Sequence, residues 1–181
     1  AAYLVKLGEQ ELVREDAQAH VGLLDVAYAL AQVREIVRGD LMRIGRERVA
    51  LGVTISPATA AILRSFHVTV ADSIEVAIHT LRVLDPQARR TVRANKSDIR
   101  ARADDTIDHL QHRLRAQDAR RWDTYELESR LVEHLRRIYH FAKRIGDAVQ
   151  PIAIDGLWNP VPPELTNRET IHRTSETPTT T

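Results

Sequence analysis

The sequence has no cysteine, few aromatic residues and no long apolar run, and each shortage excludes a class of protein. Without cysteine among its 181 residues, the chain has no disulfide, no thiolate nucleophile and no cysteine-ligated zinc, which fits a reducing cytoplasm. Aromatic residues make up only 4%, and none is interleaved with the basic residues at 89–100, so the base-stacking signature of single-strand binders is missing. No stretch approaches the roughly 20 apolar residues of a membrane span. Because the formal net charge is only +1, we expect no nucleic-acid partner.

The remaining composition favours helices, since alanine, leucine, arginine, glutamate and isoleucine dominate. Ser56-Pro57 and Asp85-Pro86 each place a capping side chain before a proline at a first helical position, and Pro151 is expected to end the last helix. We predict an all-α bundle over residues 1–150 and a disordered tail over 151–181. The main helices are predicted at 17–51, 57–84, 86–117 and 120–149.

Apolar residues recur at steps of three and four, as one buried face of a helix requires. The most regular stripe lies in the last predicted helix and consists of Leu127, Leu131, Leu135, Ile138, Ala142, Ile145 and Val149. The first long helix has a stripe of Leu23, Ala27, Leu30, Val33, Val37, Leu41 and Ile44. Short connections make sequential helices antiparallel, so the pattern predicts a bundle of long antiparallel helices.

Three segments resemble the PhoU family. The segment from Leu135 to Ile145 resembles the last helix of that family, and Val33 to Arg38 resembles the equivalent helix of its first repeat. The segment from Asp108 to Leu114 is similar to a His-Leu-x-x-Arg-Leu stretch in the PhoU-like domains that end sodium–phosphate cotransporters. The resemblance implies three-helix repeats, of which the first is incomplete here.

The resemblance also implies a cytoplasmic, membrane-associated regulator of phosphate uptake, most like the C-terminal cytoplasmic domain of a bacterial sodium–phosphate cotransporter. Its partner would be the transporter's membrane portion or another membrane-bound protein, and a homodimer stays open. A start without methionine suits a domain cut from a longer chain. No nucleophile elbow or Gly-rich phosphate loop occurs, so we expect no enzyme. A helical scaffold unrelated to phosphate and a metal-binding bundle are the alternatives.

The chain departs from the family at the metal motif, which pairs two carboxylates four residues apart. The matching positions are Arg34 and Arg38 in the first repeat, and Arg136 and His140 in the second. Because arginine repels a cation, we expect the family's metal clusters and any other cofactor to be absent. Arg34, Arg38, Arg136 and Arg137 are instead a candidate face for an anion or an acidic partner, with an ordinary solvated surface as the alternative.

Two further groups of charged side chains are candidate sites. The metal candidates share helical spacing or face one another across adjacent helices, and they are Asp104, Asp108, His109, His112 and His140. The alternative for them is boundary histidines beside an acidic face that pairs with neighbouring arginines. The second group is a basic run that is a candidate for contact with anionic lipid or an acidic membrane partner. It consists of Arg89, Arg90, Arg93, Lys96 and Arg100.

Overall fold

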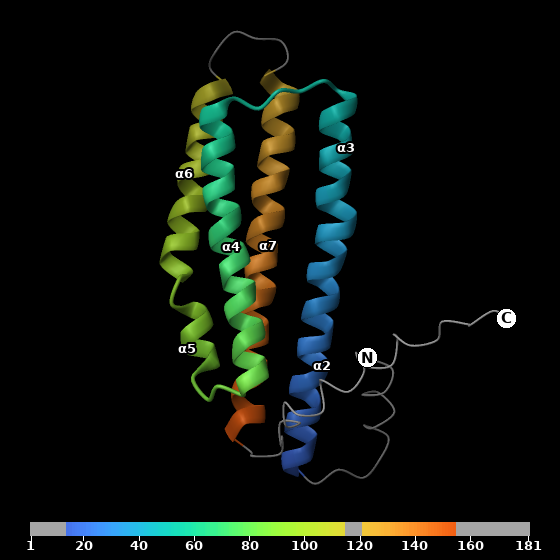
Figure 1. The fold of residues 1–181 in the computed structure, drawn as a ribbon, viewed down its shortest axis with the longest axis vertical. Helices are drawn as coiled ribbons and strands as arrows, with labels where there is room; N and C mark the ends of the chain where they lie inside the picture. The colour runs from blue at the N-terminus through green and yellow to red at the C-terminus, as the bar shows by residue number, and fades with distance from the viewer. Residues whose placement is uncertain (1–13, 115–120, 155–181) are drawn as a thin grey trace, which may run out of the picture.

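The computed structural model describes residues 14–114 and 121–154, and nearly all of them are helical (Figure 1). The first rod is continuous and consists of α2 (Arg14–Glu35), the π-helical segment η1 (Ile36–Leu41) and α3 (Met42–Ala50). The remaining helices are α4 (Pro57–Val83), α5 (Ala88–Arg93), α6 (Lys96–Leu114) and α7 (Arg121–Ile154). The predicted all-α bundle is confirmed. The predicted tail lies outside the described residues from position 155 onward.

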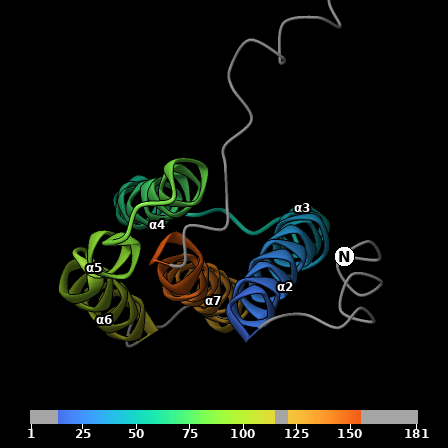
Figure 2. The ribbon, with the colours of Figure 1, turned by 90° about the horizontal axis from the view of Figure 1, so that it is seen from below.

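Helix α7 is the centre of the bundle. Figure 2 shows it between α2 and α3 on one side and α4, α5 and α6 on the other. The helices α4, α5, α6 and α7 pack together as one unit, because α4 contacts α5 and α6 and all three contact α7. The rod formed by α2, η1 and α3 packs chiefly on α7. The fold is therefore a compact helical unit with one additional rod along its central helix.

The apolar stripe predicted for α7 forms the core. Leu135, Ile145 and Val149 are almost fully buried, and the other members of the stripe are buried or pack against the same core. Helix α4 begins as expected, since the Ser56 hydroxyl accepts a hydrogen bond of 3.2 Å from the backbone N–H of Thr59. No helix among the described residues is long and apolar enough to cross a bilayer.

The stripe predicted for the first rod is partly wrong. Leu30 and Val37 are 37% and 44% exposed, whereas Val26, Ala29 and Ile36 are buried against α7. Small residues allow α2 to approach α7 closely. The face of α2 that contains these small residues is therefore the one that packs against α7. The π-helical segment rotates less per residue than an α-helix, which returns the later residues of the stripe toward the core.

Two predicted helix ends also differ from the structure. Helix α7 continues through Pro151 to Ile154, although proline removes one backbone hydrogen bond. The next residue, Ile152, is 1% exposed, and its burial favours continuation of the helix. The helix predicted at 86–117 is divided into α5 and α6, because the chain turns at Ala94 and Asn95. Asparagine is favoured at the residue that precedes a helix and disfavoured inside one.

Candidate functional site

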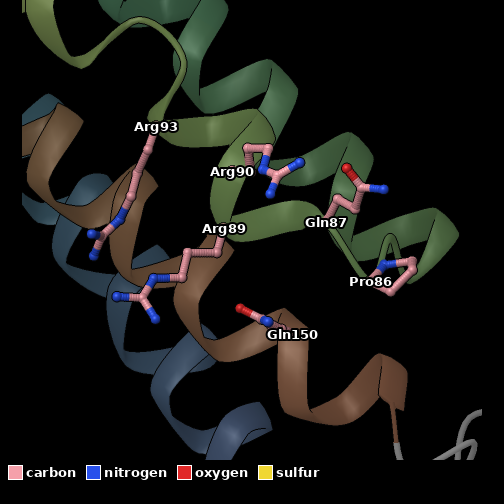
Figure 3. Close-up of a pocket in the computed structure, with 6 residues that line it drawn as sticks. All are labelled: Pro86, Gln87, Arg89, Arg90, Arg93 and Gln150. Atoms are coloured by element: carbon pink, nitrogen blue, oxygen red, sulfur yellow. The ribbon is translucent and has the colours of Figure 1, made fainter.

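Positively charged side chains gather where α5 and the start of α6 lie on α7. We call this group the cationic seam, and it consists of Arg89, Arg90, Arg93, Lys96 and Lys143. Beside it lies an open pocket of about 510 Å³ that Pro86, Gln87, the three arginines and Gln150 line (Figure 3). Arginine presents a planar fork of donors that matches phosphate and carboxylate oxygens. The pocket is therefore suited to an anionic group.

Asp147 of α7 is the carboxylate that holds the arginines in place. Arg93 Nη2 lies 2.6 Å from Asp147 Oδ2, and Arg89 Nε lies 3.4 Å from Asp147 Oδ1. All three side chains are more than a third exposed, so solvent screens these pairs and each contributes at most about 1 kcal/mol. Their main effect is positional, because one negative charge orients two arginines and leaves the seam positive.

Lys143 shows that the seam is crowded with like charge. Burial lowers the pKa of Lys143, and the nearby cations Arg93 and Lys96 lower it further, against the opposing attraction of Asp147. The Lys143 ammonium lies 5.3 Å from the centre of the Tyr139 ring, where the aromatic face attracts it. An anion bound at the seam would reduce the repulsion among these cations.

The four arginines predicted as an anion face are all exposed, but only Arg137 is tied to the opposite helix. Arg137 Nη1 lies 3.7 Å from Asp40 Oδ2 of the first rod. Arg34, Arg38 and Arg136 are on the surface of α2, η1 and α7. Their exposure is compatible with a binding face and with an ordinary solvated surface, so the binding face stays a prediction.

Asp40 lies within the π-helical segment and joins the first rod to α7. Its carboxylate lies 2.8 Å from Arg43, 3.5 Å from His134 Nδ1 and 3.7 Å from Arg137. Burial lowers the pKa of His134, and the Asp40 carboxylate partly opposes that shift. Wider turns of the π-helical type often occur at functional positions. Here the segment places a carboxylate at the contact between η1 and α7.

Two more ion pairs join the first rod to α7, one from α2 and one from α3. Arg144 lies 2.7 Å from Asp25, and Arg130 lies 2.7 Å from Glu47. With the Asp40 pairs they connect the first rod to α7 along its length. Such partly exposed pairs add little stability each, so their clearest role is to set how the two helices align.

The five metal candidates do not form one site. Within residues 14–114 and 121–154, no group of three or more histidine, aspartate or glutamate side chains is arranged to hold a metal ion. Asp104 lies 3.7 Å from Arg100, and His109 Nε2 lies 3.1 Å from the Thr59 hydroxyl. Asp108, His112 and His140 are exposed, and His140 packs edge-on against Phe141.

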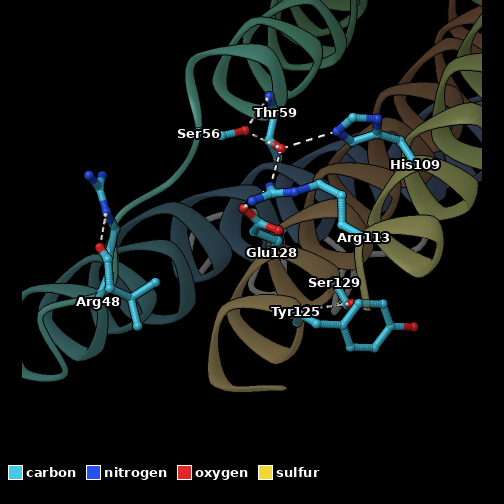
Figure 4. A network of polar contacts seen from close by, with 9 residues as sticks. Arg48, Ser56, Thr59, His109, Arg113, Tyr125, Glu128 and Ser129 are labelled. Atoms are coloured by element: carbon cyan, nitrogen blue, oxygen red, sulfur yellow. Dashed lines mark hydrogen bonds and ion pairs between the residues drawn. The ribbon is translucent and has the colours of Figure 1, made fainter. Parts of the chain in front are cut away.

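His109 instead belongs to a polar network at the end of the bundle where α4 begins and α6 ends (Figure 4). The buried Thr59 hydroxyl contacts Ser56, His109 and the Arg113 guanidinium, which donates to it. Arg113 Nη1 also lies 3.8 Å from Oε1 of the buried Glu128 on α7. The network therefore connects α4, α6 and α7.

The sequence pattern did not single out Asp147, Thr59 or Glu128. Asp147 lies 54 positions from Arg93 in the chain, so no local spacing connects the two. Glu128 follows Leu127 directly and is four residues before Val132, both of which are buried. An acidic residue so close to a buried stripe was the one signal available for Glu128. The same signal marked Asp147, which lies between Ile145 and Val149 of that stripe, whereas none marked Thr59.

No family model, no curated protein and no solved structure matches this chain. The resemblance to the PhoU family therefore rests on the sequence segments alone. The function that it implies is a proposal.

Proposed function

We propose that this bundle is a regulatory domain of phosphate uptake that docks on the cytoplasmic face of a membrane through its cationic seam. The phosphate role is supported by the resemblance to PhoU-like domains of sodium–phosphate cotransporters. The docking is supported by the seam itself, in which two of the five cations share the carboxylate of Asp147. That excess of positive charge is the observation on which the proposal depends.

The arrangement of the helices also favours this proposal. The helices α4 to α7 form a three-helix unit, if α5 and α6 are counted as one broken helix, and the first rod packs beside that unit. This fits a complete second repeat that follows an incomplete first one. A regulator of this kind acts by contact with a partner and needs no reacting group.

Anionic lipid is the surface to which we assign the seam. Lipid headgroups present phosphate oxygens in a plane, and arginines near such a surface contribute about 1 kcal/mol each. Arg89, Arg90 and Arg93 of α5 line the same open pocket, so these three cations can approach one surface together. Attraction of this kind is screened by salt.

The docking is tested by cosedimentation with vesicles of phosphatidylcholine, with and without phosphatidylglycerol. We expect binding only to the vesicles that contain phosphatidylglycerol, and weaker binding as salt rises. The combined variant Arg89→Ser, Arg90→Ser and Arg93→Ser should lose at least about tenfold in partitioning. Unchanged binding of that variant would contradict the docking.

The matched control removes equal charge elsewhere, through Arg34→Ser, Arg38→Ser and Arg136→Ser. It should bind the vesicles like the unchanged protein. A loss confined to the control would assign the docking to the arginine face that the sequence predicted.

The phosphate role has its own test, which is uptake of radiolabelled phosphate by the natural host. Deletion of this domain should change the uptake rate, and the seam variant should reproduce the effect of the deletion. Vesicle binding with unchanged uptake would favour the alternative of a scaffold unrelated to phosphate.

A further inference from the structure

A second cavity lies at the opposite end of α7 from the cationic seam, between α3, α7 and the loop at residues 51–56. We call it the end cavity, and its volume is about 160 Å³. Its walls are mainly aliphatic side chains, which are Leu41, Ile44, Val53, Ile55, Leu127 and Leu131. Ile44, Val53 and Leu127 form a small core separate from the main one. The cavity is thus a gap in a satellite core.

Glu128 also lines the end cavity, and it is the most unusual residue there. It is 3% exposed, and no described residue forms a hydrogen bond with its Oε1 atom. Arg113 approaches that oxygen to 3.8 Å, too far for a hydrogen bond, and its Nη1 donates to Thr59 instead (Figure 4). A buried acceptor without a donor is costly, so a donor from a bound molecule would be favourable here.

The size and charge of the surroundings define the class of ligand. An apolar cavity of about 150 Å³ accommodates benzene, so the end cavity fits a body of about one ring. A cationic ligand would meet the positive charges of Arg113 and Arg121, which act on Glu128. An anionic ligand would meet Glu128 itself. A neutral molecule with one hydroxyl avoids both repulsions.

We propose that the end cavity binds a compact neutral molecule of about one aromatic ring, whose hydroxyl donates a hydrogen bond to Glu128. The aliphatic walls bury the ring, and Glu128 selects for the hydroxyl. This site is separate from the cationic seam and does not depend on the proposed role in phosphate uptake.

Phenol and toluene are the probes, because they differ mainly in the donor. Titrations followed by amide NMR shifts report both the affinity and the place of binding. We expect shifts around α3 and the start of α7, with phenol bound about tenfold more tightly than toluene. Equal affinities, or shifts elsewhere in the bundle, would overturn the proposal.

Two variants and one control distinguish the walls of the end cavity from its hydrogen-bond acceptor. Val53→Phe fills the cavity and should abolish binding of both probes, whereas Leu51→Phe adds the same ring at a residue that is 52% exposed and should change neither. Glu128→Met removes the acceptor at similar size, so toluene should still bind while the preference for phenol disappears.

Glu128→Gln keeps a neutral acceptor and should retain an intermediate preference for phenol. A preference for phenol that survives in Glu128→Met would show that another group binds the hydroxyl, and it would overturn the role of Glu128. The spectrum of each free variant shows whether it is folded.

Discussion

At the scale of single residues, Glu128 is a group whose charge state depends on the fold. Burial raises the pKa of its carboxyl above the ordinary value of 4.5, and the opposing influence of Arg113 and Arg121 does not cancel that effect. Between the unfolded and folded pKa values the native state therefore binds more protons than the unfolded state. Stability is lost as pH rises through that window, because the native state must then hold a buried charge.

Glu128→Gln should therefore stabilise the protein more at about pH 7 than at about pH 4, where the glutamate is already largely protonated. A difference of order 1 kcal/mol would move Tm by about 2–4 °C for a domain of this size. Thermal unfolding of both proteins at the two pH values measures it. Glu133→Gln, an exposed change on the same helix, is the control and should alter Tm little. A stabilisation that grows toward acid pH would contradict this account.

The sequence predicts the candidate sites only where their residues are neighbours in the chain. Of the predicted basic run, Arg100 lies 3.7 Å from Asp104, whereas Arg89, Arg90, Arg93 and Lys96 lie in the cationic seam. The carboxylate that organises them comes from another helix, and periodicity along one helix carries no information about such a pair. Suitable spacing does not by itself make a site: four of the five metal candidates lie on α6 and His140 lies on α7, and the five do not come together at one point.

At the scale of the helices, the space around the glycines of the first rod shows how closely that rod approaches α7. A Cβ atom at Gly22 of α2 would lie 2.9 Å from the backbone oxygen of Ala148 and 3.0 Å from the side chain of Ile152. A Cβ atom at Gly45 of α3 would meet nothing within 4 Å. The two glycines lie in the same rod, yet only Gly22 is needed for packing.

Gly22→Ala and Gly45→Ala should accordingly have opposite effects on stability. The helix propensity of alanine favours both changes by up to about 1 kcal/mol. At position 22 the clash with α7 should exceed that gain and destabilise the protein by about 1–3 kcal/mol. Urea unfolding of the two variants measures the free energies. If both variants gained stability, the close approach of α2 to α7 would be disproved.

Of the two helix starts predicted at prolines, the one at Pro57 is confirmed, whereas α5 begins at Ala88 and not at Pro86. The hydroxyl of Ser56 and the fixed backbone of Pro57 act locally, so the start of α4 is visible in the sequence. The continuation of α7 through Pro151 depends on the burial of Ile152, and the neighbouring residues in the sequence do not predict that burial. The buried face of α2 depends likewise on its partner, because α2 has apolar residues on more than one side.

At the scale of the whole molecule, the bundle has two regions that differ in how many neighbouring helices they contact. Helices α4 to α7 contact one another on several sides, whereas the first rod depends chiefly on α7. Its ion pairs with α7, such as that between Arg144 and Asp25, are partly exposed and add little stability. Opening of the rod away from α7 therefore breaks fewer contacts than opening of the central unit.

Native-state hydrogen exchange should show this difference directly. We expect the buried backbone amides of α2 to exchange through partial openings of lower free energy than those of α7. Gly22→Ala should accelerate exchange in α2 more than in α4. Equal protection of all the long helices would mean instead that the bundle unfolds only as one cooperative unit.

The sequence by itself determined that this protein is helical and that its long helices lie side by side, because helix propensity, proline caps and apolar periodicity all act within a few residues. Only the tertiary structure decided which face of α2 is buried, which carboxylate orients the arginines of α5, and that Glu128 is enclosed beside an apolar cavity. Those outcomes depend on contacts between residues far apart in the chain, and such contacts leave no regular spacing in the sequence.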